Sequence, residues 1–204
     1  MCTSYFLLAD TYEIRNMIEE AQESKLLRRF VEAGKPLVTS GVVRPTDVVP
    51  VIAPDQKGSR RVFPMKWGFQ IPGRSLLVNA RSETAAVKPT FSEAWVRRRC
   101  AIPASWYFEW EHFISPTGKK KTGDKYIIQT KEDVTWLCGL YRIEGGMPEF
   151  VVLTREPSAE LARIHDRMPL ILPEEQIDAW IRPGSSPEEV LGYAVTELAA
   201  EKAE

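Results

Sequence analysis

The sequence predicts a single α+β domain, residues 1–204, in which a largely antiparallel, barrel-like sheet is flanked by helices. Apolar segments of strand length are separated by connections of uneven length, and the helical patterns gather toward the two ends of the chain. The regular strand–helix alternation of a doubly wound fold is missing. The 204 residues, 44% of them hydrophobic, suit one core, and no linker or repeat divides them.

The N-terminal region is predicted to be a short strand followed by a long helix. The apolar segment YFLLA precedes residues 10–34, where hydrophobic side chains recur at helical spacing. Asp10 and Glu13 form a D-x-x-E pattern that resembles a capping box at the start of this helix. Gly34 is placed to end it.

The rest of the chain is predicted to be strands joined by proline-marked turns, followed by helices. The predicted strands are 48–53, 61–69, 75–81, 100–110 and 149–154, together with a hairpin formed by 125–130 and 134–141. The predicted helices are 91–99, 157–165, 173–181 and 186–198.

Composition and charge narrow the function classes. The chain has a net charge of −1 and therefore lacks the excess of basic residues that is common in nucleic-acid-binding domains. No segment has the length of a membrane span or the pattern of a secretory signal, so we expect a cytoplasmic protein with no membrane partner. Two local basic clusters occur: Arg97, Arg98 and Arg99, and Lys119, Lys120 and Lys121. Solvated surface is the simplest interpretation of both, and we prefer it for the lysines, whose flanking glycines indicate a hairpin tip.

The three cysteines are an odd number, widely spaced and without a C-x-x-C pair, so neither a disulfide framework nor a structural zinc site is predicted. We expect no metal and no cofactor. Cys100 and Cys138 are interpreted as packing residues. Cys2 has two interpretations. If Met1 is removed, Cys2 carries a free amine and a thiol on adjacent carbons; if Met1 remains, Cys2 is one more small apolar residue.

Few residues are candidates for acid–base chemistry. His112 lies in a polar stretch that predicts a surface loop, whereas His165 lies where the helix predicted for 157–165 ends and is either structural or catalytic. Glu109 lies among aromatic residues. Strand alternation puts it on the face of Tyr107, opposite Phe108, where it either faces solvent or is partly buried with a raised pKa suited to proton transfer.

Three further residues have both a structural and a functional interpretation. Asn79 and Arg81 share a face at i, i+2 spacing at a strand end. Asn79 there suits either turn chemistry or the orientation of a nucleophile. Trp67, before a glycine, is either a core aromatic or a platform on which a base stacks.

Six segments in order resemble the SOS response associated peptidase (SRAP) family. The resemblance runs from residue 2 to about residue 172, through MC, KWGF, NARSET, RRRCAIPASWYFEW, VVLT and HDRMPLIL. It implies one α+β domain with a barrel-like core. It also implies covalent capture of abasic sites in single-stranded DNA by an N-terminal cysteine, exposed when Met1 is removed. The implied catalytic residues are Cys2, Asn79, Glu109 and His165, and the implied DNA contacts are Trp67, Arg81, Thr154, Arg167 and Pro45.

The chemistry explains why a cysteine is needed at position 2. An open abasic site is an aldehyde, and a free N-terminal amine is neutral, and so nucleophilic, in roughly a seventh of molecules at pH 7. The neighbouring thiol then closes on the imine to give a five-membered thiazolidine. The chain departs from the family's usual M-C-G-R start, because Thr3 and Ser4 replace the glycine and the phosphate-binding arginine.

Two alternatives remain at this level. One is a cysteine peptidase that uses Cys2 as nucleophile and His165 as base, either to excise Met1 or to cleave peptides in trans. The other is a non-catalytic binder of damaged or modified DNA, for which Cys2 is dispensable. In each case we expect a monomer.

Overall fold

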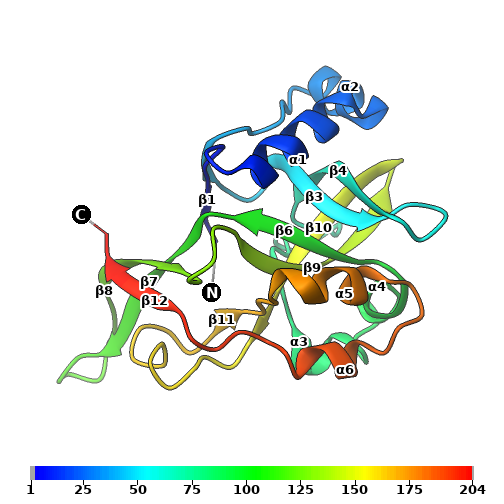
Figure 1. The fold of residues 1–204 in the computed structure, drawn as a ribbon. Coiled ribbons are helices and arrows are strands. Elements are labelled where there is room, and N and C mark those ends of the chain that lie inside the picture. The colour runs from blue at the N-terminus through cyan, green and yellow to red at the C-terminus, as the bar shows by residue number, and fades with distance from the viewer. Residues whose placement is uncertain (1–2, 204) are drawn as a thin grey trace.

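The computed structural model describes residues 3–203, so the predicted nucleophile Cys2 lies outside the described part of the chain. The strands form two sheets, of five and seven strands. Figure 1 shows the two blue helices of the N-terminal region above the seven-stranded sheet, while the five-stranded sheet extends to the other side, where the C-terminal strand lies.

The seven-stranded sheet closes on itself. It contains β3 (Val48–Pro54), β4 (Arg60–Trp67), β5 (Asn79–Arg81), β6 (Arg99–Ala104), β9 (Thr135–Glu144), β10 (Met147–Arg155) and β11 (Met168–Pro169). The order β10-β4-β3-β6-β9 returns to β10 through the β9–β10 pairing. Only β10–β4 and β10–β5 are parallel among its described strand pairings. The prediction of a largely antiparallel, barrel-like sheet is confirmed.

The five-stranded sheet is wholly antiparallel. Its order is β12-β8-β7-β1-β2. The strands are β1 (Tyr5–Leu7), β2 (Gly41–Val43), β7 (Trp106–Ile114), β8 (Lys120–Gln129) and β12 (Ala199–Lys202). The sequence analysis missed β12, and the hairpin predicted for 125–130 and 134–141 is wrong. Those residues belong to β8 and β9, which lie in different sheets, because β8 pairs with β7 and β9 with β6.

The two sheets are joined at Ser105. Residues 100–110 were predicted as one strand, but the chain leaves β6 at Ala104 and begins β7 at Trp106. The Ser105 hydroxyl accepts a hydrogen bond from the Leu8 N–H at 2.9 Å, and the Ser105 N–H donates to the Phe6 carbonyl, also at 2.9 Å. The corner therefore ties the start of the chain to the start of β7.

The helices are short and cover the barrel. They are α1 (Tyr12–Glu23), α2 (Lys25–Glu32), α3 (Ser82–Ala85), α4 (Ser92–Arg97), the 3₁₀ helix η1 (Glu174–Gln176), α5 (Ile177–Ile181) and α6 (Pro187–Leu191). The helix predicted for 10–34 breaks at Ser24, which ends α1 and caps α2. Its N-cap is Thr11 rather than Asp10, because the Thr11 hydroxyl accepts from the Ile14 N–H.

Residues 157–165 were predicted as a helix and form turns instead. Their main-chain hydrogen bonds mix three- and four-residue spans; the Ile164 N–H, for example, donates to the Leu161 carbonyl. This irregular segment carries His165 beneath the five-stranded sheet.

A single hydrophobic cluster fills the interior, and all seven residues of β3 are buried. Cys100 and Cys138 are fully buried, and burial raises the pKa of both thiols, so their interpretation as packing residues is confirmed. The solvated-surface interpretation is wrong for Arg99. Its guanidinium is buried and donates to the carbonyls of Trp95, Val96, Trp180, Arg182 and Ser185.

Candidate functional site

Glu109 lies in the middle of β7 and is buried, at 4% exposure. Lys125 on β8 contacts the rings of both Phe108 and Trp110, which confirms that these two aromatics share the opposite face. Of the two interpretations of Glu109, the buried carboxylate is therefore the one that the structure has, and not the solvent-facing one. Burial raises the pKa of its carboxyl above the ordinary value, which suits a group that gives and takes protons near neutral pH.

His165 lies against Glu109. The His165 Nε2 is 3.9 Å from the Glu109 Oε1, and the imidazole is only 7% exposed. Burial lowers the pKa of His165 to about 4, so the ring is neutral at pH 7. A neutral imidazole beside a carboxyl of raised pKa can accept a proton during a reaction.

Two contacts at the His165 Nδ1 belong to different protonation states. The Arg167 N–H donates to Nδ1 at 3.0 Å, which requires a free lone pair there. The Asp166 Oδ1 lies 2.8 Å from the same atom and favours a proton on it. The Asp166 side chain is 81% exposed and solvated, whereas the main-chain N–H is fixed. We therefore place the single N–H of the neutral ring on Nε2, facing Glu109. When the ring becomes charged, its second N–H lies on Nδ1 beside the Asp166 carboxylate.

Acid is expected to destabilise the protein through His165. Its pKa is about 4 in the folded chain and 6.5 ordinarily, so between these values the unfolded chain binds a proton that the folded chain does not. The stabilisation is fully present above pH 6.5 and is lost as the pH falls toward 4, by about 3 kcal/mol in total. Urea unfolding of wild type and His165→Gln at pH 7, 5.5 and 4 measures this pH-dependent part of the free energy of unfolding.

Because the other titrating groups are common to both proteins, the difference between the two pH curves isolates His165. Glu109, whose pKa is raised, acts in the opposite direction in both. Wild-type and His165→Gln curves that fall in parallel would show that the imidazole is not held neutral by burial.

The start of the described chain lies beside Glu109. The Phe108 N–H donates to the Ser4 carbonyl at 3.0 Å, and Tyr5 on β1 pairs with Tyr107 on β7. Ser4 is itself buried. The N-terminal segment is therefore bonded to the strand that carries the buried carboxyl, one residue away from it.

A second group of predicted residues lies at the end of β5. Asn79 is half-buried and Arg81 is exposed, and both border a cavity of about 460 Å³ with Thr154 of the neighbouring β10. Arg74 and Lys88 line the same cavity. No described residue forms an ion pair with Arg74, Arg81 or Lys88, so their charges are available to an anion such as phosphate.

Arg167 connects the two groups. Its guanidinium binds both Glu83 carboxylate oxygens at 2.8 Å and donates to the Thr154 carbonyl at 2.7 Å. The Thr154 side chain has no exposed surface here, although the residue borders the basic cavity, and its contact with DNA stays a prediction. Its role in the structure is to hold Arg167 two residues from His165. Glu83, which the sequence analysis did not single out, occupies the guanidinium that was predicted to bind phosphate.

The side chain of Trp67 has no exposed surface, and its contact with DNA stays a prediction. The ring lies between Tyr5 and Phe150, at centroid distances of 5.5 and 6.1 Å. Its indole N–H donates to the Val78 carbonyl at 2.9 Å, next to Asn79. Trp67 is thus a core aromatic, which is the structural interpretation given to it above. Its hydrogen bond also holds the chain in place at Val78, just before β5 begins.

Pro45 is half-buried in a turn closed by the Asp47 carboxylate, which accepts from the Arg44 N–H at 2.8 Å. Its contact with DNA stays a prediction. His112, predicted in a loop, lies on β7, and its exposed ring is 4.6 Å from the His165 ring. This proximity could not be predicted from the sequence, because it depends on where the segment 156–167 crosses β7.

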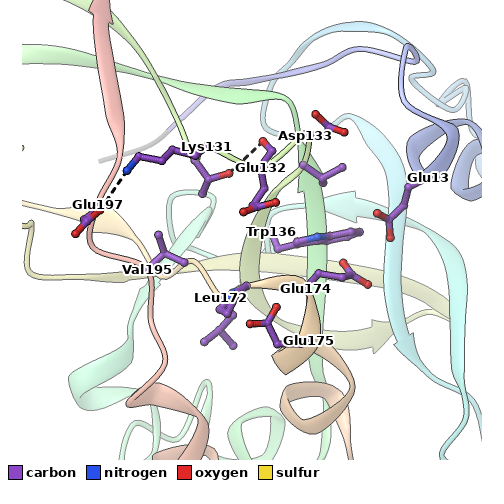
Figure 2. A pocket seen from close by; sticks show the side chains of 13 residues that line it. Glu13, Lys131, Glu132, Asp133, Trp136, Leu172, Glu174, Glu175, Val195 and Glu197 are labelled. Carbon is purple, nitrogen blue, oxygen red and sulfur yellow. Dashed lines mark hydrogen bonds and ion pairs between the residues drawn. The ribbon is translucent and has the colours of Figure 1, made fainter.

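A separate cavity of about 510 Å³ has the wrong charge for DNA. Figure 2 shows Trp136 at its centre with acidic side chains around it. These include Glu13, Glu132, Glu174 and Glu175. Because phosphates are repelled by such a surface, the basic cavity bordered by Asn79 is the better candidate for a nucleic-acid strand.

Within residues 3–203, no helix has the length and apolar character needed to cross a bilayer. In the same range, no three His, Cys, Asp or Glu side chains gather closely enough to hold a metal ion.

Comparison with known proteins gives consistent matches. The family model described as SOS response associated peptidase (SRAP) matches residues 1–203. Abasic site processing protein YoqW of Bacillus subtilis is 27% identical over 195 residues, which cover 90% of this chain and 81% of that protein. Abasic site processing protein YoaM of the same organism is 31% identical over 137 residues, 61% of this chain, and the match spans only 58% of YoaM.

Two solved structures have the same fold. A protein from Bacteroides thetaiotaomicron gives a TM-score of 0.72 at 20% identity, covering 100% of this chain and 92% of that one. A phage-related protein from Bordetella bronchiseptica gives 0.71 at 19% identity, covering 99% and 94%. At these identities the likeness shows the fold alone.

Proposed function

The chain belongs to the SOS response associated peptidase (SRAP) family, and from this premise we propose that it processes abasic sites in single-stranded DNA by covalent capture. The nucleophile is Cys2 after removal of Met1. The relatives named abasic site processing proteins support the substrate. No cofactor or metal is required by this reaction.

The capture has two bond-forming steps. The amine nitrogen of Cys2 adds to the C1′ aldehyde of the open abasic sugar, and loss of water leaves an imine. The thiol sulfur of Cys2 then adds to the imine carbon, and its proton ends on the nitrogen, which completes the thiazolidine ring. An internal cysteine cannot do this, because its nitrogen is an amide.

The observation that carries the proposal is the position of Ser4. Its carbonyl is bonded to the Phe108 N–H, immediately before Glu109 on β7. Glu109 in turn lies 3.9 Å from His165. The described start of the chain is thus held beside two buried acid–base groups, which is what a reaction at the N-terminus needs.

Each site residue then has a role in the proposal. Glu109 gives and takes protons at the amine and at the sugar oxygen, and His165 accepts the proton that the amine releases. Asn79 orients the amine from the end of β5. Arg81 holds a phosphate at the basic cavity, with Arg74 and Lys88 beside it. Arg167 binds a phosphate only when DNA displaces Glu83 from its guanidinium.

The proposal is tested by the intact mass of the protein before and after incubation with single-stranded DNA that carries one abasic site. We expect a chain without Met1 that gains the mass of the DNA in an adduct stable to denaturation. Cys2→Ala is expected to form no such adduct, because it lacks the thiol that closes the ring.

Two other outcomes would overturn the proposal. Turnover of peptides added in trans, without a DNA adduct, would make the protein a cysteine peptidase. Reversible binding of abasic DNA that is equal in wild type and Cys2→Ala would make it a non-catalytic binder.

A further inference from the structure

The two histidines of the chain lie next to each other although their environments differ. His165 is 7% exposed, whereas His112 is exposed on β7. Their ring centroids are 4.6 Å apart and the ring planes are tilted by 49°. The contact between these two described rings is a ring–ring contact without a direct hydrogen bond, and a single water can bridge their nitrogens at this separation.

An irregularity in the β7–β8 pairing lies between Glu109 and His112. In a regular strand these two residues, three apart, point to opposite faces. The register shifts between Trp110 and His112, where β8 has one residue more than β7, and such a bulge locally bends and twists the paired strands. The His112 N–H also donates to the Ile164 carbonyl at 2.9 Å, which fixes β7 to the segment that carries His165.

The proposed reaction needs a route for a proton out of the site. At pH 7 most of the N-terminal amine is an ammonium ion. Its condensation with the aldehyde gives the imine, one water and one proton, and ring closure consumes no further proton. A buried base that accepts this proton must pass it on, because burial disfavours the charged imidazole at His165.

We propose that His112 is the outer member of a proton relay, which takes the proton from His165 and delivers it to solvent during abasic-site capture. This inference rests on the proposed function. His112 acts through His165 and does not contact the DNA. Among residues 3–203, the charged or titratable groups that face His165 include Glu109 and His112 from β7 and Asp166 from its own segment. Asp166, which is exposed, is the competing exit.

The test is the single-turnover rate of adduct formation by wild type and His112→Gln, with and without imidazole in the buffer. We expect His112→Gln to be slowed roughly tenfold, less than the ~10²–10⁴ that a group acting directly on the reactants contributes. Added imidazole should restore the variant and leave wild type unchanged, since a small base can replace the lost relay but cannot repair a disturbed strand.

Two further variants make the test specific. Glu111→Gln, which changes a charge next to His112 in the same strand, should behave as wild type. In a His165→Ala background, His112→Gln should have no further effect, because the relay has lost its inner member.

Three results would overturn the relay. The first is a wild-type rate of adduct formation in His112→Gln. The second is a slower rate in His112→Gln that imidazole does not restore and that persists in the His165→Ala background, and the third is an imidazole-sensitive slowing in Asp166→Asn but not in His112→Gln. A wild-type protein that forms no adduct at all would instead overturn the proposed function, and the relay with it.

Discussion

Glu109→Gln slows adduct formation by a factor of about 10²–10⁴, the usual contribution of a group that transfers protons directly. Glutamine keeps the size and shape of the side chain but can neither give nor accept the proton. The carboxyl lies buried on β7 beside His165, and burial raises its pKa above the ordinary value, which favours its protonated form. Single-turnover kinetics with abasic single-stranded DNA measure the effect.

The stability of the same variant separates a chemical defect from a folding defect. Because burial disfavours the ionised carboxyl, Glu109→Gln removes a destabilising charge and should unfold at an equal or higher urea concentration than wild type at pH 7. Glu111→Gln, two residues along β7, is the matched control and should react at the wild-type rate. Wild-type kinetics in Glu109→Gln would refute the assignment of the carboxyl.

Strand periodicity predicted the face of Glu109 but not its burial. Alternation along 106–110 correctly separated Glu109 from Phe108 and Trp110, as their contacts with Lys125 show. The exposure of Glu109 depends on the segment 156–167, which lies much later in the chain and folds across β7. That segment was itself predicted to be a helix, because its apolar spacing is helical, and it forms turns tied to β7 by the His112–Ile164 hydrogen bond.

The fold class and the positions of several strands could be predicted from the local sequence pattern. Which strands pair with one another could not. The strands at 48–53, 61–69 and 149–154 are present in the closed barrel. The hairpin prediction failed because only three residues separate 125–130 from 134–141, and nothing local shows that the chain passes from one sheet to the other there. The same reason hid the corner at Ser105, whose side chain is bonded to Leu8, nearly a hundred residues earlier.

Charge and exposure distinguish the two arginines that were predicted to contact DNA. Arg81 is exposed and has no ion-pair partner among the described residues, which leaves its charge open to a phosphate, and its contact with DNA stays a prediction. Arg167 has the same chemistry but is held by Glu83, which lies only two residues beyond Arg81 in the sequence. The carboxylate of Glu83, so close in the sequence to a predicted phosphate contact, could have been recognised as a competing partner for a predicted phosphate-binding arginine.

Trp67→Ala is expected to lower the free energy of unfolding by about 3–5 kcal/mol, the usual loss when a buried large aromatic is truncated to alanine. The side chain is fully buried between Tyr5 and Phe150, and its N–H satisfies the Val78 carbonyl. Urea unfolding measures the loss.

Trp67→Phe tests whether the ring acts in the core or on DNA, since it keeps an aromatic of similar shape and removes the hydrogen bond to Val78. We expect it to cost about 0.5–1.5 kcal/mol, the net contribution of one hydrogen bond, because the Val78 carbonyl keeps the bond that it accepts from the Val152 N–H at 3.0 Å. The affinity for single-stranded DNA should be unchanged. Adduct formation should slow more than binding, because Val78 immediately precedes Asn79 and a shift there moves the residue that orients the amine. A variant of wild-type stability that binds DNA more weakly would instead place Trp67 against a base.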